Sequence, residues 1–182
     1  RETTIYILDE KKGECRKILE KHAVMSLGWS PDDELLFFSG NDLNRGYATH
    51  TTIWVIPPMR GEPTNLTSNL DLGSGRVVYN DLRSQIAGPQ TPIWDGDKII
   101  FPVSEGGRTA LHSVRPEDAD ITPVVVGNFC VEEFSVRKGV IAYTRTGIAE
   151  PMEVYIKNRE KETKITRLAE DTLSEAPMIN GE

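Results

Sequence analysis

Three stretches of the chain share one pattern, and this internal repeat restricts the possible folds more than any other feature. Each stretch has an aromatic residue, then a polar turn, then an apolar run. Each is followed by two further apolar runs. The stretches are residues 27–40, 92–106 and 132–147, and their aromatic residues are Trp29, Trp94 and Phe134.

A repeat of about 40–50 residues with four short strands in each unit is typical of β-propeller blades. We therefore predict an all-β fold, a partial β-propeller of about three complete four-stranded antiparallel blades and half of another. The half blade is predicted over residues 1–21 and the complete blades over 22–68, 89–127 and 128–168. Residues 169–182 are acidic and lack a strand pattern, so we expect a linker that leaves the propeller.

The second strand of each complete blade is predicted from a continuous apolar run, at residues 34–39, 98–103 and 140–144. Continuous apolar runs are typical of strands that are covered on both faces, as in stacked blades. Propellers close with about four to eight blades, so this stack leaves faces and edges bare. We expect them to be covered by blades elsewhere in a longer chain or by self-association with a second copy.

Composition excludes several classes of function. The formal charge of −7 argues against a nucleic-acid partner, and no apolar run is long enough to span a membrane. The sequence begins at Arg1 without a signal-peptide pattern, so we expect a piece of a longer, cytoplasmic protein. Cys15 and Cys130 are predicted to be reduced and partly buried. The sequon at Asn65 falls in a predicted strand and is interpreted as a chance match.

No catalytic constellation is found in the sequence, and no metal site or cofactor is predicted. The nearest string to a nucleophile elbow, at residues 28–32, lacks the second glycine. The three histidines, His22, His50 and His112, have no partner at metal-ligand spacing. The aspartates at 32, 33, 95 and 97 fall in predicted turns, and turn formation is a sufficient reason for aspartate at these positions.

A group of arginines is the one functional pattern that remains. In a propeller, the connections between the second and third strands open on the same face as the connections between blades. Arg45, Arg108 and Arg145 fall in the connections between the second and third strands. The long insertion before the second blade, at residues 69–90, belongs to the same face and adds Arg76 and Arg83. Guanidinium groups on one rim can bind peptide termini, acidic side chains or an acidic docking surface. The alternative is that they are solvated loop charges. The candidates for substrate gating are Arg45, Arg83, Arg108 and Arg145.

Two motifs give the chain a resemblance to a known family. Residues 29–38 match a W-S-P-D-x-x-x-L-x-F pattern, and residues 146–155 end in P-M-E-V-Y. Together with the acidic stretch after Leu168, they resemble the last blades of the propeller in the prolyl oligopeptidase family, most closely its acylaminoacyl-peptidase branch. TolB-like propellers share the first motif. The second blade departs from the pattern, because Trp94 is followed by Asp95 and Gly96 rather than Ser-Pro.

The resemblance implies that catalysis and substrate selection lie on different domains. Members of that family have an α/β-hydrolase domain with a Ser-Asp-His triad, capped by a propeller that admits short peptides. No residue here matches the triad. The first hypothesis is therefore a non-catalytic propeller portion of a serine peptidase, with the hydrolase domain and short peptides as partners. The alternative is a TolB-like interaction propeller without a peptidase domain.

Overall fold

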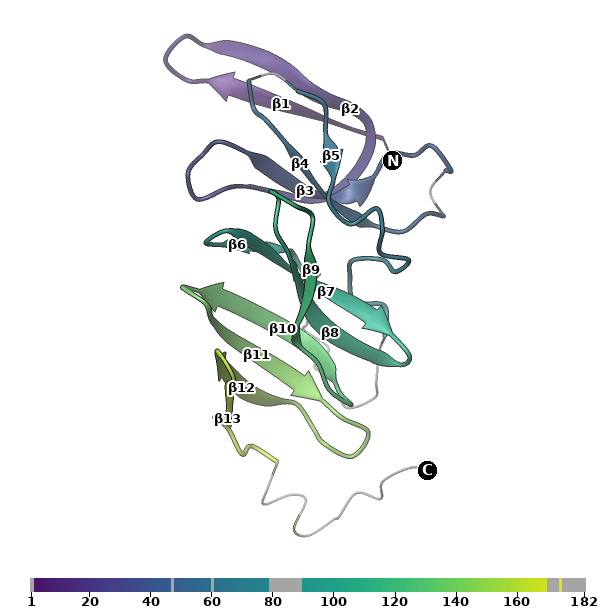
Figure 1. Cartoon of the computed structure of the whole chain (residues 1–182), viewed down its shortest axis with the longest axis vertical. Helices are drawn as coiled ribbons and strands as arrows, with labels where there is room; N and C mark the ends of the chain where they lie inside the picture. The colour runs from purple at the N-terminus through teal and green to yellow at the C-terminus, as the bar shows by residue number, and fades with distance from the viewer. Residues whose placement is uncertain (1, 47, 60, 79–89, 170–173, 175–182) are drawn as a thin grey trace.

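The chain folds into antiparallel strands arranged as layers that follow one another in chain order (Figure 1). The computed structural model describes residues 2–46, 48–59, 61–78, 90–169 and 174, and the regular elements within them are the strands β1–β13. They form a sheet in the order β1-β2-β3-β4-β5 and a second in the order β13-β12-β11-β10-β8-β7-β6, with β9 paired to β8. The predicted all-β, partial propeller is confirmed.

The first sheet contains a half blade and the first complete blade. Its strands are β1 (Thr3–Asp9), β2 (Glu14–Trp29), β3 (Leu36–Asn41), β4 (Thr52–Ile56) and β5 (Thr64–Asn65). β2 is one continuous strand across the predicted limit between residues 21 and 22, and Figure 1 shows it curving from the top layer into the next. Lys21 has a φ of 59°, a left-handed conformation that turns the backbone at this point.

The second sheet contains the other two blades. The second blade has β6 (Ile93–Asp95), β7 (Lys98–Glu105), β8 (Arg108–Val114) and β9 (Ile121–Val125). The third has β10 (Cys130–Arg137), β11 (Val140–Thr146), β12 (Glu153–Asn158) and β13 (Lys161–Lys164). They join in one sheet because Cys130 of β10 pairs with Thr109 of β8 in parallel.

The outer strands of the first and third blades, β5 and β13, end in the same way. After β5, the N–H of Leu66 still donates to the carbonyl of Ile53, but the N–H of Ile53 donates to the Thr67 hydroxyl at 3.0 Å. After β13, the N–H of Val154 likewise donates to the Thr166 hydroxyl at 2.8 Å. A threonine side chain thus replaces the next backbone partner and ends each ladder.

Three apolar cores lie between successive layers, and the second strands of the first and second blades each separate two of them. In β3, Phe38 packs toward the half blade and Phe37 toward the second blade. In β7, Ile99 packs toward the first blade and Ile100 toward the third. Because successive side chains point to opposite faces, an unbroken apolar run supplies both cores.

The aromatic residues of the repeat face the preceding layer, but they are not equally covered. Trp94 lies 5.7 Å from Phe37 between ring centroids and packs on the core between the first two blades. Phe134 packs on the next core. Trp29 is paired with Leu36 on the half-blade side and is 44% exposed, because only β1 and the first part of β2 lie there.

Both cysteines are free, as expected, but only one is shielded. Cys130 is buried, and burial raises the pKa of its thiol. Cys15 is exposed rather than partly buried. It is paired with Leu8, itself 59% exposed, on a face of the half blade that no described strand covers.

The shared cores predict a large cost for truncating a residue between two blades. Phe101 is fully buried in the core between the first and second blades. We expect Phe101→Ala to lower the free energy of unfolding by about 3–5 kcal/mol in urea denaturation. Tyr6→Ala is the matched control, because Tyr6 is 58% exposed, and we expect a much smaller change. Equal losses in the two variants would contradict the layered core.

Candidate functional site

The connections predicted to form one rim do lie together on one side of the molecule. The β3–β4 connection, the β7–β8 turn, the β11–β12 connection and the described residues 70–78 after β5 lie toward the right of the view in Figure 1. We call this side the loop rim. The β6–β7 and β10–β11 turns lie at the opposite side.

Residues 73–78, here called the crossing segment, run along the loop rim from the first blade over the second. The N–H of Ser74 donates to the carbonyl of Thr51 at 2.6 Å, and the N–H of Gly75 donates to the carbonyl of Pro102 at 2.8 Å. Further on, the N–H of Val77 donates to the Ser104 hydroxyl at 3.1 Å. These bonds place Arg76 beside the third blade.

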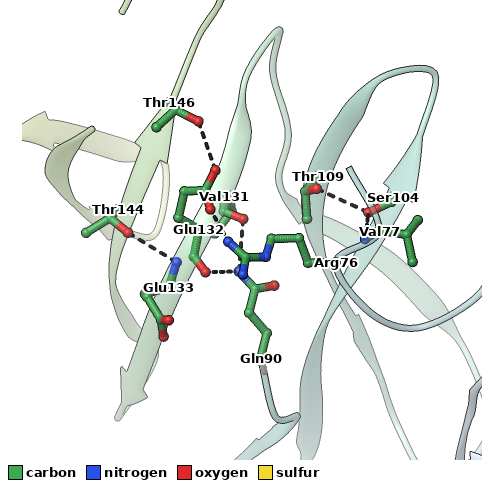
Figure 2. A network of polar contacts seen from close by, with 10 residues as sticks. All are labelled: Arg76, Val77, Gln90, Ser104, Thr109, Val131, Glu132, Glu133, Thr144 and Thr146. Atoms are coloured by element: carbon green, nitrogen blue, oxygen red, sulfur yellow. Dashed lines mark hydrogen bonds and ion pairs between the residues drawn. The ribbon is translucent and has the colours of Figure 1, made fainter. Parts of the chain in front are cut away.

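Arg76 forms a buried ion pair with Glu132 of β10 (Figure 2). The Arg76 side chain is 6% exposed and that of Glu132 is fully buried. The Thr146 hydroxyl donates to the second Glu132 carboxylate oxygen at 3.0 Å, and the Gln90 amide donates to the carbonyl oxygens of Val131 and Glu132. With these partners, the carboxylate and the β10 backbone link the crossing segment to the third blade.

A β-bulge explains why Glu132 can reach inward. The pairing of β10 with β11 shifts between Val131 and Glu133, so Glu132 is the extra residue. Bulges of this kind redirect a side chain. The first blade has the same shift between Val24 and Ser26, where the extra residue is Met25, which is 76% exposed. The sequence pattern did not indicate a bulge in either strand.

Arg145, one of the predicted gating residues, lies in β11 rather than in a loop and is already engaged. Its guanidinium carbon lies 3.8 Å from the Tyr155 ring centroid and 4.4 Å from that of Phe129. Nitrogens of the same group lie 3.7 Å from a Glu150 oxygen and 3.3 Å from a Glu162 oxygen. The side chain is 17% exposed. Cation–π contacts and ion pairs therefore hold it against the third blade.

Arg108 is the first residue of β8 and is exposed. It lines a cavity of about 380 Å³ whose walls include Val103, Ala110 and Val126. His112 lines the same cavity, and its Nδ1 is buried without a hydrogen-bond partner in the described structure. Burial lowers the pKa of this imidazole, although Glu105 opposes the shift. The cavity thus combines the cation of Arg108 and the carboxylate of Glu105 with apolar walls and a half-buried imidazole.

Arg45 is exposed in the β3–β4 connection and lines a different cavity, of about 740 Å³. Asp42, His50 and Asp71 line that cavity with it. Arg83 lies outside the described residues. The structure therefore places Arg45, Arg108 and Arg145 on one side of the molecule but does not bring them into one site.

Glu153, within the P-M-E-V-Y motif, anchors the segment that follows the last strand. It is 2% exposed and accepts hydrogen bonds from the Thr166 hydroxyl and from the N–H of Ala169, the latter at 3.2 Å. Burial on its own raises the pKa of this carboxyl. The hydrogen bonds from Thr166 and from the backbone of Leu168 and Ala169 outweigh it, so the pKa lies below its ordinary value.

The described residues offer neither a cluster of metal ligands nor a membrane-spanning helix. They contain no group of three or more His, Cys, Asp or Glu side chains that could hold a metal ion. In that same part of the chain, no helix has both the length and the apolar character needed to cross a membrane.

Comparison with known proteins supports the fold. No protein-family model matches the sequence, and no curated protein does. Among solved structures, the chain is similar to a portion of a class of β-propellers that occur in peptidases and in TolB.

Acylaminoacyl peptidase from Pyrococcus horikoshii matches with a TM-score of 0.70 and 17% identity, over 94% of this chain and 24% of that one. The β-propeller domain of the Trilobed protease from Pyrococcus furiosus matches with a TM-score of 0.65 and 18% identity. The match covers 90% of this chain and 43% of that domain's chain. TolB from Acinetobacter baumannii matches with a TM-score of 0.57 and 13% identity. The match covers 90% of this chain and 37% of the TolB chain. The chain spans less than half the length of each, and the likeness establishes the fold.

The buried ion pair predicts that removing only one charge is costly. We expect Arg76→Met to lower the free energy of unfolding by about 3–5 kcal/mol, because Glu132 is left charged and buried. Replacing both residues, as Arg76→Met with Glu132→Met, should recover part of that loss in urea denaturation. Arg115→Met is the control, since the Arg115–Asp118 pair is exposed and should contribute little. Additive losses in the double variant would contradict the pairing.

The lowered pKa of Glu153 predicts an acid-dependent contribution to stability. A carboxyl with a depressed folded-state pKa stabilises the fold above its unfolded pKa of about 4.3, and the contribution is lost as pH falls toward the folded value. We expect Glu153→Gln to be less stable than the parent at pH 7, with the difference shrinking below about pH 4. Thermal melts across this range measure it. A difference independent of pH would contradict the assignment.

Proposed function

We propose that this chain is the non-catalytic propeller portion of a serine peptidase of the acylaminoacyl-peptidase type, in the prolyl oligopeptidase family. The observation that carries the proposal is the match of 94% of the chain to part of an acylaminoacyl peptidase, at a TM-score of 0.70. The P-M-E-V-Y segment adds to it, because Glu153 anchors the segment that follows the last strand. In this proposal the chemistry belongs to a hydrolase domain outside this chain.

The role of the propeller in this proposal is to select short peptides by size and by their charged ends. Stacked blades form a rigid wall, which excludes folded substrates sterically. Arg108 is the best candidate for contact with a peptide carboxylate, since it is exposed beside apolar walls that could accept a neighbouring side chain. Arg45 is a second candidate, and Arg83 remains a candidate from the sequence. Arg145 would act indirectly, by holding Glu150 and Glu162 in place.

The proposal that this portion has no peptidase activity of its own has a direct test. We expect the purified 182-residue chain to show no turnover of acyl-peptide or prolyl-peptide reporters. The positive control is the parent protein with its hydrolase domain. Turnover by the chain alone, together with its covalent labelling by a serine-hydrolase inhibitor, would contradict the proposal.

The gating role is tested in the parent protein with paired substrates. We expect Arg108→Ala to raise the KM of a peptide with a free C-terminal carboxylate several-fold, and to leave the KM of the matching amide unchanged. Arg115→Ala on the opposite side is the control. Equal effects on both substrates would show that Arg108 is a solvated loop charge.

The TolB-type interaction propeller is the other candidate function. The likeness to TolB supports it, but at the lower TM-score of 0.57. The coding sequence downstream of Glu182 separates the two candidates. A G-x-S-x-G motif after a predicted strand favours the peptidase, and its absence favours the interaction propeller.

A further inference from the structure

A third cavity lies on the side of the molecule opposite the loop rim, in a cleft between the second and third blades. Its volume is about 480 Å³, which suits a ligand of two or three amino-acid residues. Its apolar lining includes the half-buried Val124 and, beneath it, Ile100 and Ile141, which are 1% and 3% exposed and belong to the core between the second and third blades. Its charged residues come from the turns at the mouth and from the strands next to them.

The two blades are fastened at the inner end of the cleft. The Asp95 carboxylate, in the β6–β7 hairpin, accepts hydrogen bonds from the N–H of Lys138 at 2.7 Å and of Gly139 at 2.6 Å. The outer strands β9 and β12 are not linked in this way, since β9 pairs with β8 and β12 with β11 and β13. Blades held at the inner edge and separate at the outer edge leave a wedge between them.

Three of the four cations that line the cleft are not held in ion pairs within the described structure. The chain has a formal charge of −7, yet Lys98, Lys157 and Arg159 line this cleft, and none forms an ion pair with a carboxylate within the described structure. Arg115 differs, because it pairs with Asp118 at 2.6 Å and Asp120 at 3.5 Å. Asp97, Asp120 and Glu160 also line the cleft, so its four cations, Arg115 included, face three carboxylates and the lining carries a net charge of +1.

We propose that this cleft binds a short acidic peptide segment. One apolar side chain of the segment lies against the half-buried Val124, above the buried Ile100 and Ile141, and carboxylates on either side of it pair with Lys98, Lys157 and Arg159. Charge-assisted hydrogen bonds to carboxylates favour this ligand over a neutral peptide, and the apolar lining favours a peptide over a small inorganic anion. The cleft lies away from Arg45 and Arg108, so the inference is independent of the proposed gating role.

The experiment uses the 182-residue chain and the peptide acetyl-Glu-Leu-Glu-amide, titrated by calorimetry. We expect saturable binding that weakens at least tenfold for acetyl-Gln-Leu-Gln-amide and several-fold for acetyl-Glu-Gly-Glu-amide. The double variant Lys157→Gln with Arg159→Gln should also weaken binding at least tenfold. Lys11→Gln with Lys12→Gln is the matched control, since it removes the same charge from the exposed β1–β2 turn and should bind like the parent.

A second measurement does not depend on any variant. In methyl NMR spectra of the parent chain, the peptide should shift the resonances of Ile100, Val124 and Ile141 and leave those of Ile5 and Ile53 unchanged. Three outcomes would overturn the proposal: equal binding of the Glu and Gln peptides, equal weakening in both double variants, or methyl shifts confined to residues outside the cleft. Arg108→Ala should leave this binding unchanged, whether or not the gating role holds.

Discussion

The structure depends on strands that are buried on both faces at once. Phe37 and Phe38 are neighbours in β3, yet they belong to different cores, and Ile99 and Ile100 divide in the same way in β7. A single blade therefore has no core of its own, because each core is completed by the next layer. Stability then comes from contacts between neighbours, as in other repeat architectures. The exposure of Trp29 shows the same rule at the half blade, where the preceding layer is thinner.

Polar contacts at the edges set how the apolar layers are oriented. Arg16 of the half blade donates to the carbonyls of Pro58 and Met59 in the first blade. Asp95 joins the inner turns of the second and third blades on one side, and the Arg76–Glu132 pair joins the crossing segment to the third blade on the other. Apolar packing is non-directional, whereas hydrogen bonds and buried ion pairs have a required geometry. These contacts therefore define the loop rim and the inter-blade cleft.

The most buried charged groups of the described structure hold segments of the chain in place. Its most buried carboxylates, Glu132 and Glu153, each have hydrogen-bond donors from the chain itself and hold segments in place. Arg145 is similarly engaged by rings and carboxylates. The cations that remain accessible line separate cavities, Arg108 on the loop rim and Lys157 in the cleft. Recognition of acidic or carboxylate-bearing ligands is the chemistry that these accessible groups offer.

The second strand of each blade, the turn at Asp95 and the propeller class followed from the sequence alone, because apolar runs and turn residues act locally. The same local logic placed Arg145 in a loop, whereas pairing with β12 keeps it in a strand. The bulge at Glu132, the termination of β5 by Thr67 and the engagement of Arg76 were decided only by the tertiary structure. Each depends on a partner distant in the sequence, and a one-residue change in register redirects a side chain without altering the apolar pattern.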